Sequence, residues 1–355
     1  QSSQTRLREE LTMSKKVVTF GEVMMRLAPP GYQRFVQANS FDATYAGGEA
    51  NVAASLAQYG YDAYFVTKLP PTELGLACKF FLQKYGIKTD YIKMEGGRLG
   101  IYFLEAGASQ RASKVIYDRK DSAIAQVQPG EFDWPTIFAD AAVFHITGIT
   151  PALSDNAAAV SLEAVQAAKK AGLTVSCDLN FRKNLWSSAK AGAVMSTLMP
   201  YVDIAIANEE DAEKVFGIKA ENTHLEAGKI DDGGYREVCR KLVDRFGFKK
   251  VAITLRESYS ASDNGWSAIL FDSAMNEFYK SKKYDIHIVD RVGGGDSFGG
   301  GLLYGLLQGM DNQQCIEFAV AASCLKHSIP GDFNLVSVAE VEALMKGDGS
   351  GRVQR

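Results

Sequence analysis

Short apolar runs alternate with longer amphipathic stretches along most of the chain. The apolar runs at 16–21 and 63–69 predict strands, because runs of this length can be buried on both faces of a sheet. Each is followed by a stretch with helical periodicity, at 49–59 and 72–85, that ends before a glycine. The first part of the chain therefore predicts a repeated strand–helix unit.

The same alternation resumes in the middle of the chain. Apolar runs predict strands at 141–147, 173–179, 202–207 and 250–255. Amphipathic stretches predict helices near 154–171, 187–199, 209–216 and 234–246. Such alternation is typical of an α/β, doubly wound fold, in which a mostly parallel sheet carries helices on both faces.

Two regions, 26–45 and 100–119, interrupt this alternation. Polar and aromatic residues alternate there in strand fashion without an intervening helix, which predicts a small antiparallel subdomain or lid. Residues 13–346 are expected to form one domain that carries these two lid segments. Residues 1–12 are expected to be a disordered tail or an added extension, and residues 347–355 a frayed tail.

Composition narrows the classes of partner. The 39 basic and 42 acidic residues are spread along the chain and give a net charge of -3, so neither nucleic acid nor a membrane surface is an expected partner. The longest apolar stretches are strand-sized, which predicts a soluble protein. Five cysteines without a CxxC pair favour the reducing cytoplasm, and four dispersed histidines give little support for zinc. A small-molecule substrate is expected.

The segment 290–296, Asp-Arg-Val-Gly-Gly-Gly-Asp, precedes a predicted helix at 297–308. Gly293, Gly294 and Gly295 allow backbone amides to turn inward beside the positive end of a helix, where they could hold phosphate charge. Asp296 then stands where a hydroxyl nucleophile would approach. The alternative is a glycine-rich turn with Asp296 as helix N-cap.

Other motifs overlap this region and fit less well. The Gly-Lys pair at 228–229 is followed by isoleucine, which excludes a P-loop. A dinucleotide-binding fingerprint that starts at Gly293 fails at Phe298, where a third glycine is needed. The segment 295–299 matches the nucleophile elbow of hydrolases, but the short remainder of the chain would have to supply both an acid and a histidine.

A second glycine motif lies near the N-terminus. In the segment 47–53, Gly-Gly-Glu-Ala-Asn-Val-Ala, Gly47 and Gly48 allow close approach of a ligand, and Asn51 can hydrogen-bond hydroxyl groups. By itself this segment is equally well explained as a glycine-rich helix start.

Together, the segments 47–53 and 290–296 resemble the paired signatures of the PfkB (ribokinase) family of carbohydrate kinases, and the resemblance runs from about 16 to 337. It implies a ribokinase-like doubly wound sheet with a small β lid. It also implies that Asp296 is the catalytic base, and that the amides of Gly293, Gly294 and Gly295 stabilise the transferred phosphoryl group.

The resemblance also implies cofactors and an assembly. ATP would lie along Asn208, Thr254, Arg256, Gly293 and Gly295. The segment 208–211 is similar to the family's magnesium and phosphate motif, which assigns Mg²⁺ to Asp211 or Glu210 through water. Helix-start chemistry explains the same residues without a metal. The family further implies a cytoplasmic homo-oligomer and leaves a monovalent-cation requirement open.

For the substrate, Met25 and Arg26 stand near the position where neutral-sugar members carry an aspartate. Segments 100–105, 115–123, 178–182 and 326–332 are similar to the 2-keto-3-deoxygluconate kinase branch of the family. That resemblance assigns the sugar acid to Gly47, Gly48, Asn51, Tyr102, Tyr117, Arg119, Arg182, Asp296 and Asp332. Guanidinium groups suit a carboxylate because they offer paired donors and stay charged.

The expected reaction is therefore ATP-dependent phosphorylation of 2-keto-3-deoxy-D-gluconate at its 6-hydroxyl, in sugar-acid catabolism. The alternatives are a fructokinase or other neutral-sugar kinase, and a non-catalytic sugar-acid sensor, against which the presence of Asp296 argues. Preference between epimers at C4 is left open.

Overall fold

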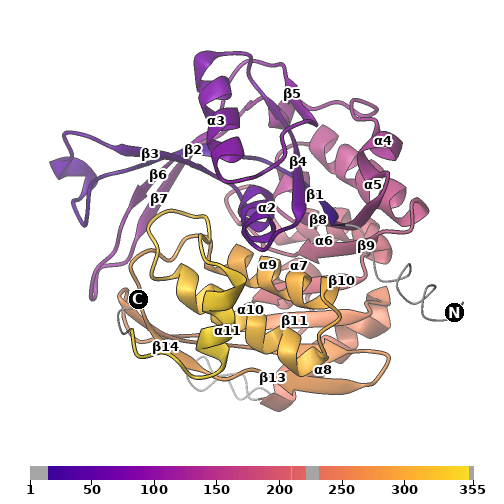
Figure 1. Cartoon of the computed structure of the whole chain (residues 1–355). Helices are drawn as coiled ribbons and strands as arrows, with labels where there is room; N and C mark the ends of the chain where they lie inside the picture. The colour runs from indigo at the N-terminus through magenta and orange to yellow at the C-terminus, as the bar shows by residue number, and fades with distance from the viewer. Residues whose placement is uncertain (1–14, 209, 221–231, 352–355) are drawn as a thin grey trace, which may run out of the picture.

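A computed structural model describes residues 15–208, 210–220 and 232–351. It has one large central sheet with helices on both faces, and a small sheet that projects from one end (Figure 1). The central sheet contains the strands β1 (Lys16–Phe20), β4 (Asp62–Leu69), β5 (Ile92–Met94), β8 (Ala141–Thr147), β9 (Thr174–Asp178), β10 (Ile204–Asn208), β11 (Lys250–Ser258), β12 (Asp263–Asp272), β13 (Glu277–Lys280) and β14 (Tyr284–His287). The predicted doubly wound fold class is confirmed.

The strand order of the central sheet is β13-β12-β11-β10-β9-β8-β1-β4-β5, and β14 also pairs with β12. Pairing is parallel from β11 to β5 and antiparallel around β12. The chain proceeds in one direction from β1 to β4 and β5, and in the other from β8 to β11. The order therefore reverses at β1, and ligands of such sheets bind at the carboxyl ends of the strands beside that point.

Two hydrophobic clusters, one on each face, hold the helices to the sheet. One face is covered by α2 (Gly48–Gln58), α3 (Glu73–Lys84), α9 (Gly294–Leu307), α10 (Asn312–Lys326) and α11 (Val338–Met345). The other is covered by α4 (Trp134–Phe138), α5 (Asp155–Lys170), α6 (Ser188–Leu198), α7 (Asp211–Phe216) and α8 (Asp232–Phe246). Short 3₁₀ turns occupy Phe35–Gln37, Ile124–Gln126, Thr150–Ala152 and Met199–Tyr201.

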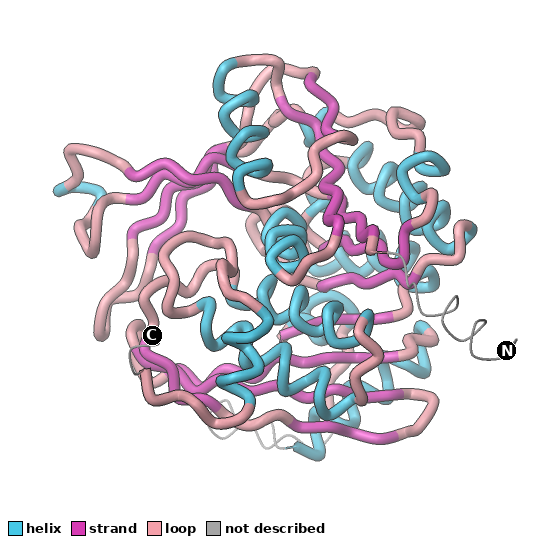
Figure 2. The backbone as a smooth tube through the Cα atoms, viewed as in Figure 1, coloured by secondary structure: helices cyan, strands magenta, loops and turns pink. Residues whose placement is uncertain are grey.

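The two interrupted regions form the small sheet, from β2 (Met24–Ala28), β3 (Asp42–Ala46), β6 (Ile101–Glu105) and β7 (Lys114–Asp118), in the order β3-β2-β6-β7 (Figure 2). Its outer pairs are antiparallel, but β2 and β6 run parallel. The prediction of an antiparallel sheet is therefore wrong at its centre, because a long crossover through β4 and α3 joins these two strands.

Residues 1–12, predicted to be a tail, lie outside the described residues, and the predicted tail at 347–355 is described only as far as 351. In the part of the chain that the structure describes, no helix combines the length and the apolar character needed to cross a membrane.

Candidate active site

Asp296 lies in the first turn of α9, close to the carboxyl ends of the central strands. The helix begins at Gly294, and its N-cap is Gly293, whose φ of 81° is left-handed. Asp296 is therefore not the N-cap, contrary to the alternative reading of this turn. A Cβ on Gly293 would lie 2.0 Å from the carbonyl oxygen of Asp332, so both its conformation and its surroundings require glycine.

Gly294 also lacks room for a side chain. A Cβ there would lie 2.6 Å from Cε1 of His327. The His327 ring is fixed by Ser323 O, 2.6 Å from Nδ1, and by Arg256 Nη2, 3.2 Å from Nε2. Because burial and nearby Arg256 lower the His327 pKa to about 3, the ring is neutral, with Nδ1 as donor and Nε2 as acceptor.

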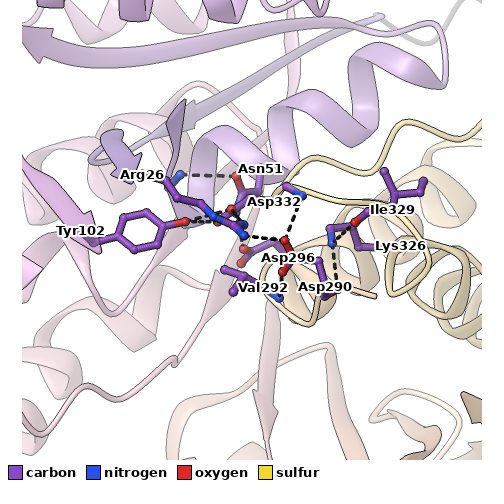
Figure 3. Close-up of polar contacts among 11 residues, drawn as sticks. Arg26, Asn51, Tyr102, Asp290, Val292, Asp296, Lys326, Ile329 and Asp332 are labelled. Carbon is purple, nitrogen blue, oxygen red and sulfur yellow. Dashed lines mark hydrogen bonds and ion pairs between the residues drawn. The ribbon is translucent and has the colours of Figure 1, made fainter. Parts of the chain in front are cut away.

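Asn51 connects the two glycine motifs. Its Nδ2 donates a 2.7 Å hydrogen bond to Oδ2 of Asp296, and its Oδ1 accepts from the amide of Gly47 at 3.3 Å, which fixes the orientation of the side-chain amide (Figure 3). Burial raises the Asp296 pKa to about 6; Asn51 lowers it, nearby Asp332 raises it and Arg182 lowers it. At neutral pH Asp296 is mostly ionised yet close to its titration range, as a general base should be.

The predicted substrate residues surround one cavity of about 100 Å³. All nine line it: Gly47, Gly48, Asn51, Tyr102, Tyr117, Arg119, Arg182, Asp296 and Asp332. The small sheet supplies one wall and the loops after β1, β8 and β9 supply another, so segments far apart in sequence meet here.

The predicted nucleotide residues line a second cavity, of about 430 Å³. Its walls include Asn208, Thr254, Arg256, Gly293, Gly294 and Gly295, together with the metal candidates Glu210 and Asp211. Asp296 and Arg182 line both cavities. A group bound in the small cavity and one bound in the large cavity would therefore meet at Asp296.

Two predicted substrate residues, Tyr102 and Asp332, form hydrogen bonds with each other, and Asp332 also pairs with Arg26. Asp332 accepts a 2.6 Å hydrogen bond from Nη1 of Arg26 and bonds of 2.9 and 2.7 Å from the hydroxyl of Tyr102 (Figure 3). Nη2 of Arg26 donates to Asp290, also at 2.6 Å. These side chains join the small sheet to the loop that precedes Gly293, and the sequence did not assign Arg26 or Asp290 to the site.

The acids near β10 divide between structure and cavity wall. Asp211 accepts hydrogen bonds from the backbone amides of Phe181, at 3.1 Å, and Asn208, at 3.0 Å, and Oδ1 of Asn208 accepts from the amides of Glu210 and Asp211 at the start of α7. Glu210 is exposed on the wall, and its Oε2 lies 3.7 Å from the ammonium of Lys214. These contacts favour the helix-start interpretation of Asp211.

Asp178 is a further acid on the same wall, at the end of β9, that the sequence did not single out as a metal residue. Burial raises its pKa well above 3.8, and nearby Asp211 and Asp296 raise it further. A cation would relieve this repulsion, and Asp178 and Glu210 offer the carboxylate oxygens that Mg²⁺ prefers. The wall therefore fits a Mg²⁺ ion carried in with a nucleotide.

Comparison with known proteins agrees with this geometry. The model of the pfkB family carbohydrate kinases matches residues 14–334. The chain belongs to the PfkB family. Among solved structures, 2-dehydro-3-deoxygluconokinase from Thermotoga maritima is 52% identical with a TM-score of 0.90, covering 94% of this chain and 98% of that one.

Curated relatives of this PfkB kinase include the 2-dehydro-3-deoxygalactonokinase of Haloferax volcanii, 32% identical over 96% of this chain and 99% of that protein. The 2-dehydro-3-deoxygluconokinase of Thermoproteus tenax is 28% identical, over 93% of this chain and 95% of that protein. The kinase prediction is confirmed at the level of the family.

Two buried charges of the PfkB kinase escaped the sequence analysis. Glu22 follows β1 and lines the small cavity, and Lys326 ends α10 at the edge of the glycine loop. The available signals were an acid directly after a central strand and a lysine in an otherwise apolar helix. Neither signal names the partner, which lies far away in the sequence.

Proposed function

We propose that this PfkB kinase transfers the γ-phosphoryl group of ATP to the 6-hydroxyl of 2-keto-3-deoxy-D-gluconate. The observation that carries the proposal is the position of Asp296 on the walls of both cavities. A sugar hydroxyl in the small cavity and a phosphate in the large one would approach each other beside this carboxylate.

In the proposed reaction, Asp296 accepts the proton of the hydroxyl as the oxygen attacks the γ-phosphorus and the bond to the β-phosphate oxygen breaks. The amides at the start of α9, from Gly294 and Gly295, would stabilise charge on the transferred group. Mg²⁺ at the oxygen-rich wall would bridge the phosphates of the nucleotide.

The two guanidinium groups on the wall of the small cavity favour an acidic sugar. Arg119 and Arg182 both line it, and Arg182 reaches the boundary with the large cavity. A guanidinium there would pair with a carboxylate of the substrate. The names of the similar proteins from Thermotoga maritima and Thermoproteus tenax point to the gluconate epimer, and that from Haloferax volcanii to the galactonate epimer.

A coupled ADP-release assay tests the proposal. Ketodeoxygluconate, ketodeoxygalactonate, gluconate, fructose and ribose would be compared, with Asp296→Asn as the inactive control. We expect the highest kcat/KM with ketodeoxygluconate. Preference for fructose or ribose would instead support a neutral-sugar kinase. Calorimetric binding of the sugar acid without any turnover would support a sensor.

We also infer a cytoplasmic homo-oligomer. The small sheet exposes Ile116 of β7 at 54% of its surface, and the turn between β2 and β3 exposes Val36 at 92%. Such apolar exposure on a protruding sheet favours contact with a second copy of the chain. Light scattering of the wild type and of Ile116→Lys would measure the assembly, and a wild-type monomer at micromolar concentration would exclude it.

A further inference from the structure

Lys326 is a fully buried lysine whose role in the site is not catalytic. It ends α10, a helix whose neighbouring buried residues are apolar or small, and its exposed fraction is 0%. Its Nζ donates hydrogen bonds to the backbone carbonyl oxygens of Asp290 and Ile329, each at 3.1 Å (Figure 3). The ammonium thus joins two turns that lie beside the glycine loop.

Two carboxylates offset part of the cost of burying the Lys326 ammonium. Burial lowers its pKa, but the carboxylates of Asp290 and Asp332 oppose that shift. Asp290 and Asp332 are also the ion-pair partners of Arg26, so two cations and two anions form a neutral cluster. Without the ammonium, this buried cluster would carry a net negative charge, which is costly away from water.

The two carbonyl oxygens around the ammonium are the kind of ligand that replaces the hydration shell of K⁺. We propose that the Lys326 ammonium serves as a built-in monovalent cation that fixes the glycine loop, so that the enzyme needs no free K⁺ or related ion. The inference rests on the phosphoryl transfer proposed above and concerns how that site is held in place.

The connection to the loop is direct. The carboxylate of Asp290 accepts hydrogen bonds from the amide of Val292, at 3.1 Å, and from the amide of Gly331, at 2.9 Å. Val292 immediately precedes the N-cap of α9. By holding the carbonyl of the same Asp290, Lys326 fixes the start of the turn that aims Asp296 at the substrate, which makes it a positioning residue.

The test compares the wild type and three variants in K⁺, NH₄⁺ or tetramethylammonium salts at equal ionic strength. We expect wild-type kcat to be the same in all three salts. Lys326→Met keeps most of the side-chain length but loses the charge, and should lose about 10²-fold in kcat with a near-normal KM for the sugar, because small displacements of a catalytic group cost this much. Added cations should not restore it.

Lys326→Ala leaves a space between the two carbonyls. Its kcat should recover at least tenfold on adding K⁺ or NH₄⁺, but not with the larger tetramethylammonium. Its melting temperature should also rise with K⁺ relative to tetramethylammonium, by ligand linkage. Lys68→Met is the matched control, because Lys68 is also buried but pairs with Glu131 outside both cavities. It should lose stability and show no response specific to K⁺.

Three results would overturn the inference: a wild type that K⁺ activates several-fold, a Lys326→Ala protein whose melting temperature and kcat are indifferent to K⁺, or a Lys326→Met enzyme with normal kcat. The melting arm requires no sugar, so it decides the question even if ketodeoxygluconate proves not to be the substrate. If Lys326→Ala fails to fold, the wild-type salt comparison and Lys326→Met still decide.

Discussion

Arg119 donates both Nε and Nη2 to a single carboxylate oxygen, Oε2 of Glu22, and the Nε bond is 2.8 Å long. The other oxygen of Glu22 accepts from the hydroxyl of Ser122 at 2.9 Å. The two charged side chains are 10% and 2% exposed, so the pair is a buried link between the small sheet and the central sheet. Arg119 therefore serves as a structural link even before any substrate binds.

The first prediction concerns the stability of this pair. Arg119→Ala would leave the carboxylate of Glu22 buried without its partner, which typically costs about 3 to 5 kcal/mol. The double variant Glu22→Gln, Arg119→Met removes both charges and should recover most of that loss. Denaturant unfolding of Glu22→Gln, Arg119→Met and the double variant measures the coupling. Equal instability of Arg119→Ala and the double variant would argue against the link.

Arg182 is the freer of the two predicted carboxylate contacts. Among the described residues, its Nη1 donates a hydrogen bond to the backbone carbonyl oxygen of Phe181, at 3.3 Å. Loss of a charge-assisted contact costs about 1.5 to 3 kcal/mol, so Arg182→Ala should lower kcat/KM for ketodeoxygluconate by roughly 10 to 150-fold.

Neutral sugars serve as control substrates for Arg182→Ala. Any activity toward neutral sugars should fall much less in Arg182→Ala, because they lack the carboxylate, and KM for ATP should change little. Arg182→Lys keeps the charge but loses the paired donors, and should fall between the wild type and Arg182→Ala. Equal losses for acidic and neutral sugars would contradict a carboxylate contact.

The protonation of Asp296 should determine how kcat decreases at acidic pH. A general base must be unprotonated, so kcat should fall as the pH drops through about 6, the value to which burial raises the Asp296 pKa. Asp296→Ala should lose about 10² to 10⁴-fold in kcat while ATP affinity is largely kept. Near-normal turnover in Asp296→Ala would remove this residue from the mechanism.

The ionised carboxylate of Asp296 should also lower the stability of the folded protein at neutral pH. The Asp296 pKa is raised from 3.8 in the unfolded chain to about 6 in the folded one, so the folded state favours the protonated form. Its contribution to stability is complete below the unfolded pKa and is lost as the pH rises through about 6. At pH 7.5, Asp296→Asn should therefore be more stable than the wild type by up to about 3 kcal/mol. Thermal unfolding should show this advantage shrinking toward pH 4; an advantage independent of pH would refute the explanation.

The small sheet should close over the sugar. Tyr102, Tyr117 and Arg119 lie on it or at its edge, whereas the glycine loop lies at the start of α9, which packs on the central sheet. Hydrogen exchange within 26–45 and 100–119 should become slower when sugar acid is added, because closure excludes water. Arg182→Ala offers a control with weakened sugar binding. Protection confined to 293–299 would show that the small sheet does not move.

The sequence predicted most of the central sheet because its strands are buried on both faces and stand out as apolar runs. It missed the three-residue strand β5, and it missed β12 to β14, whose antiparallel pairing and polar turns interrupt that pattern. It placed the start of α9 after Asp296, because glycine is a poor helix former, whereas Gly294 is helical and packs against His327.

The site could be predicted as a set of residues but not as a network. The nine residues that the resemblance named all line the small cavity, yet the partners of Arg119 and Asp332 follow from folding rather than from local sequence. Glu22 is 97 positions from Arg119, and Arg26 is 306 positions from Asp332. No periodicity or motif spacing carries information over such separations.

The contact of Arg26 with Asp332 also affects the order in which the protein folds during its synthesis. Residues that far apart cannot meet until nearly the whole chain has left the ribosome, and pairing across such separations is slow because a long loop must close first. During synthesis, Arg26 and Tyr102 of the small sheet would stay unpaired until Asp332 has been made. Asp332 would then complete the cluster with Arg26 and Asp290. In a chain that ends before residue 332, the small cavity would therefore lack the part of its wall that Asp332 supplies. Limited proteolysis of ribosome-bound chains should cleave the small sheet in chains shorter than this and spare it in longer ones.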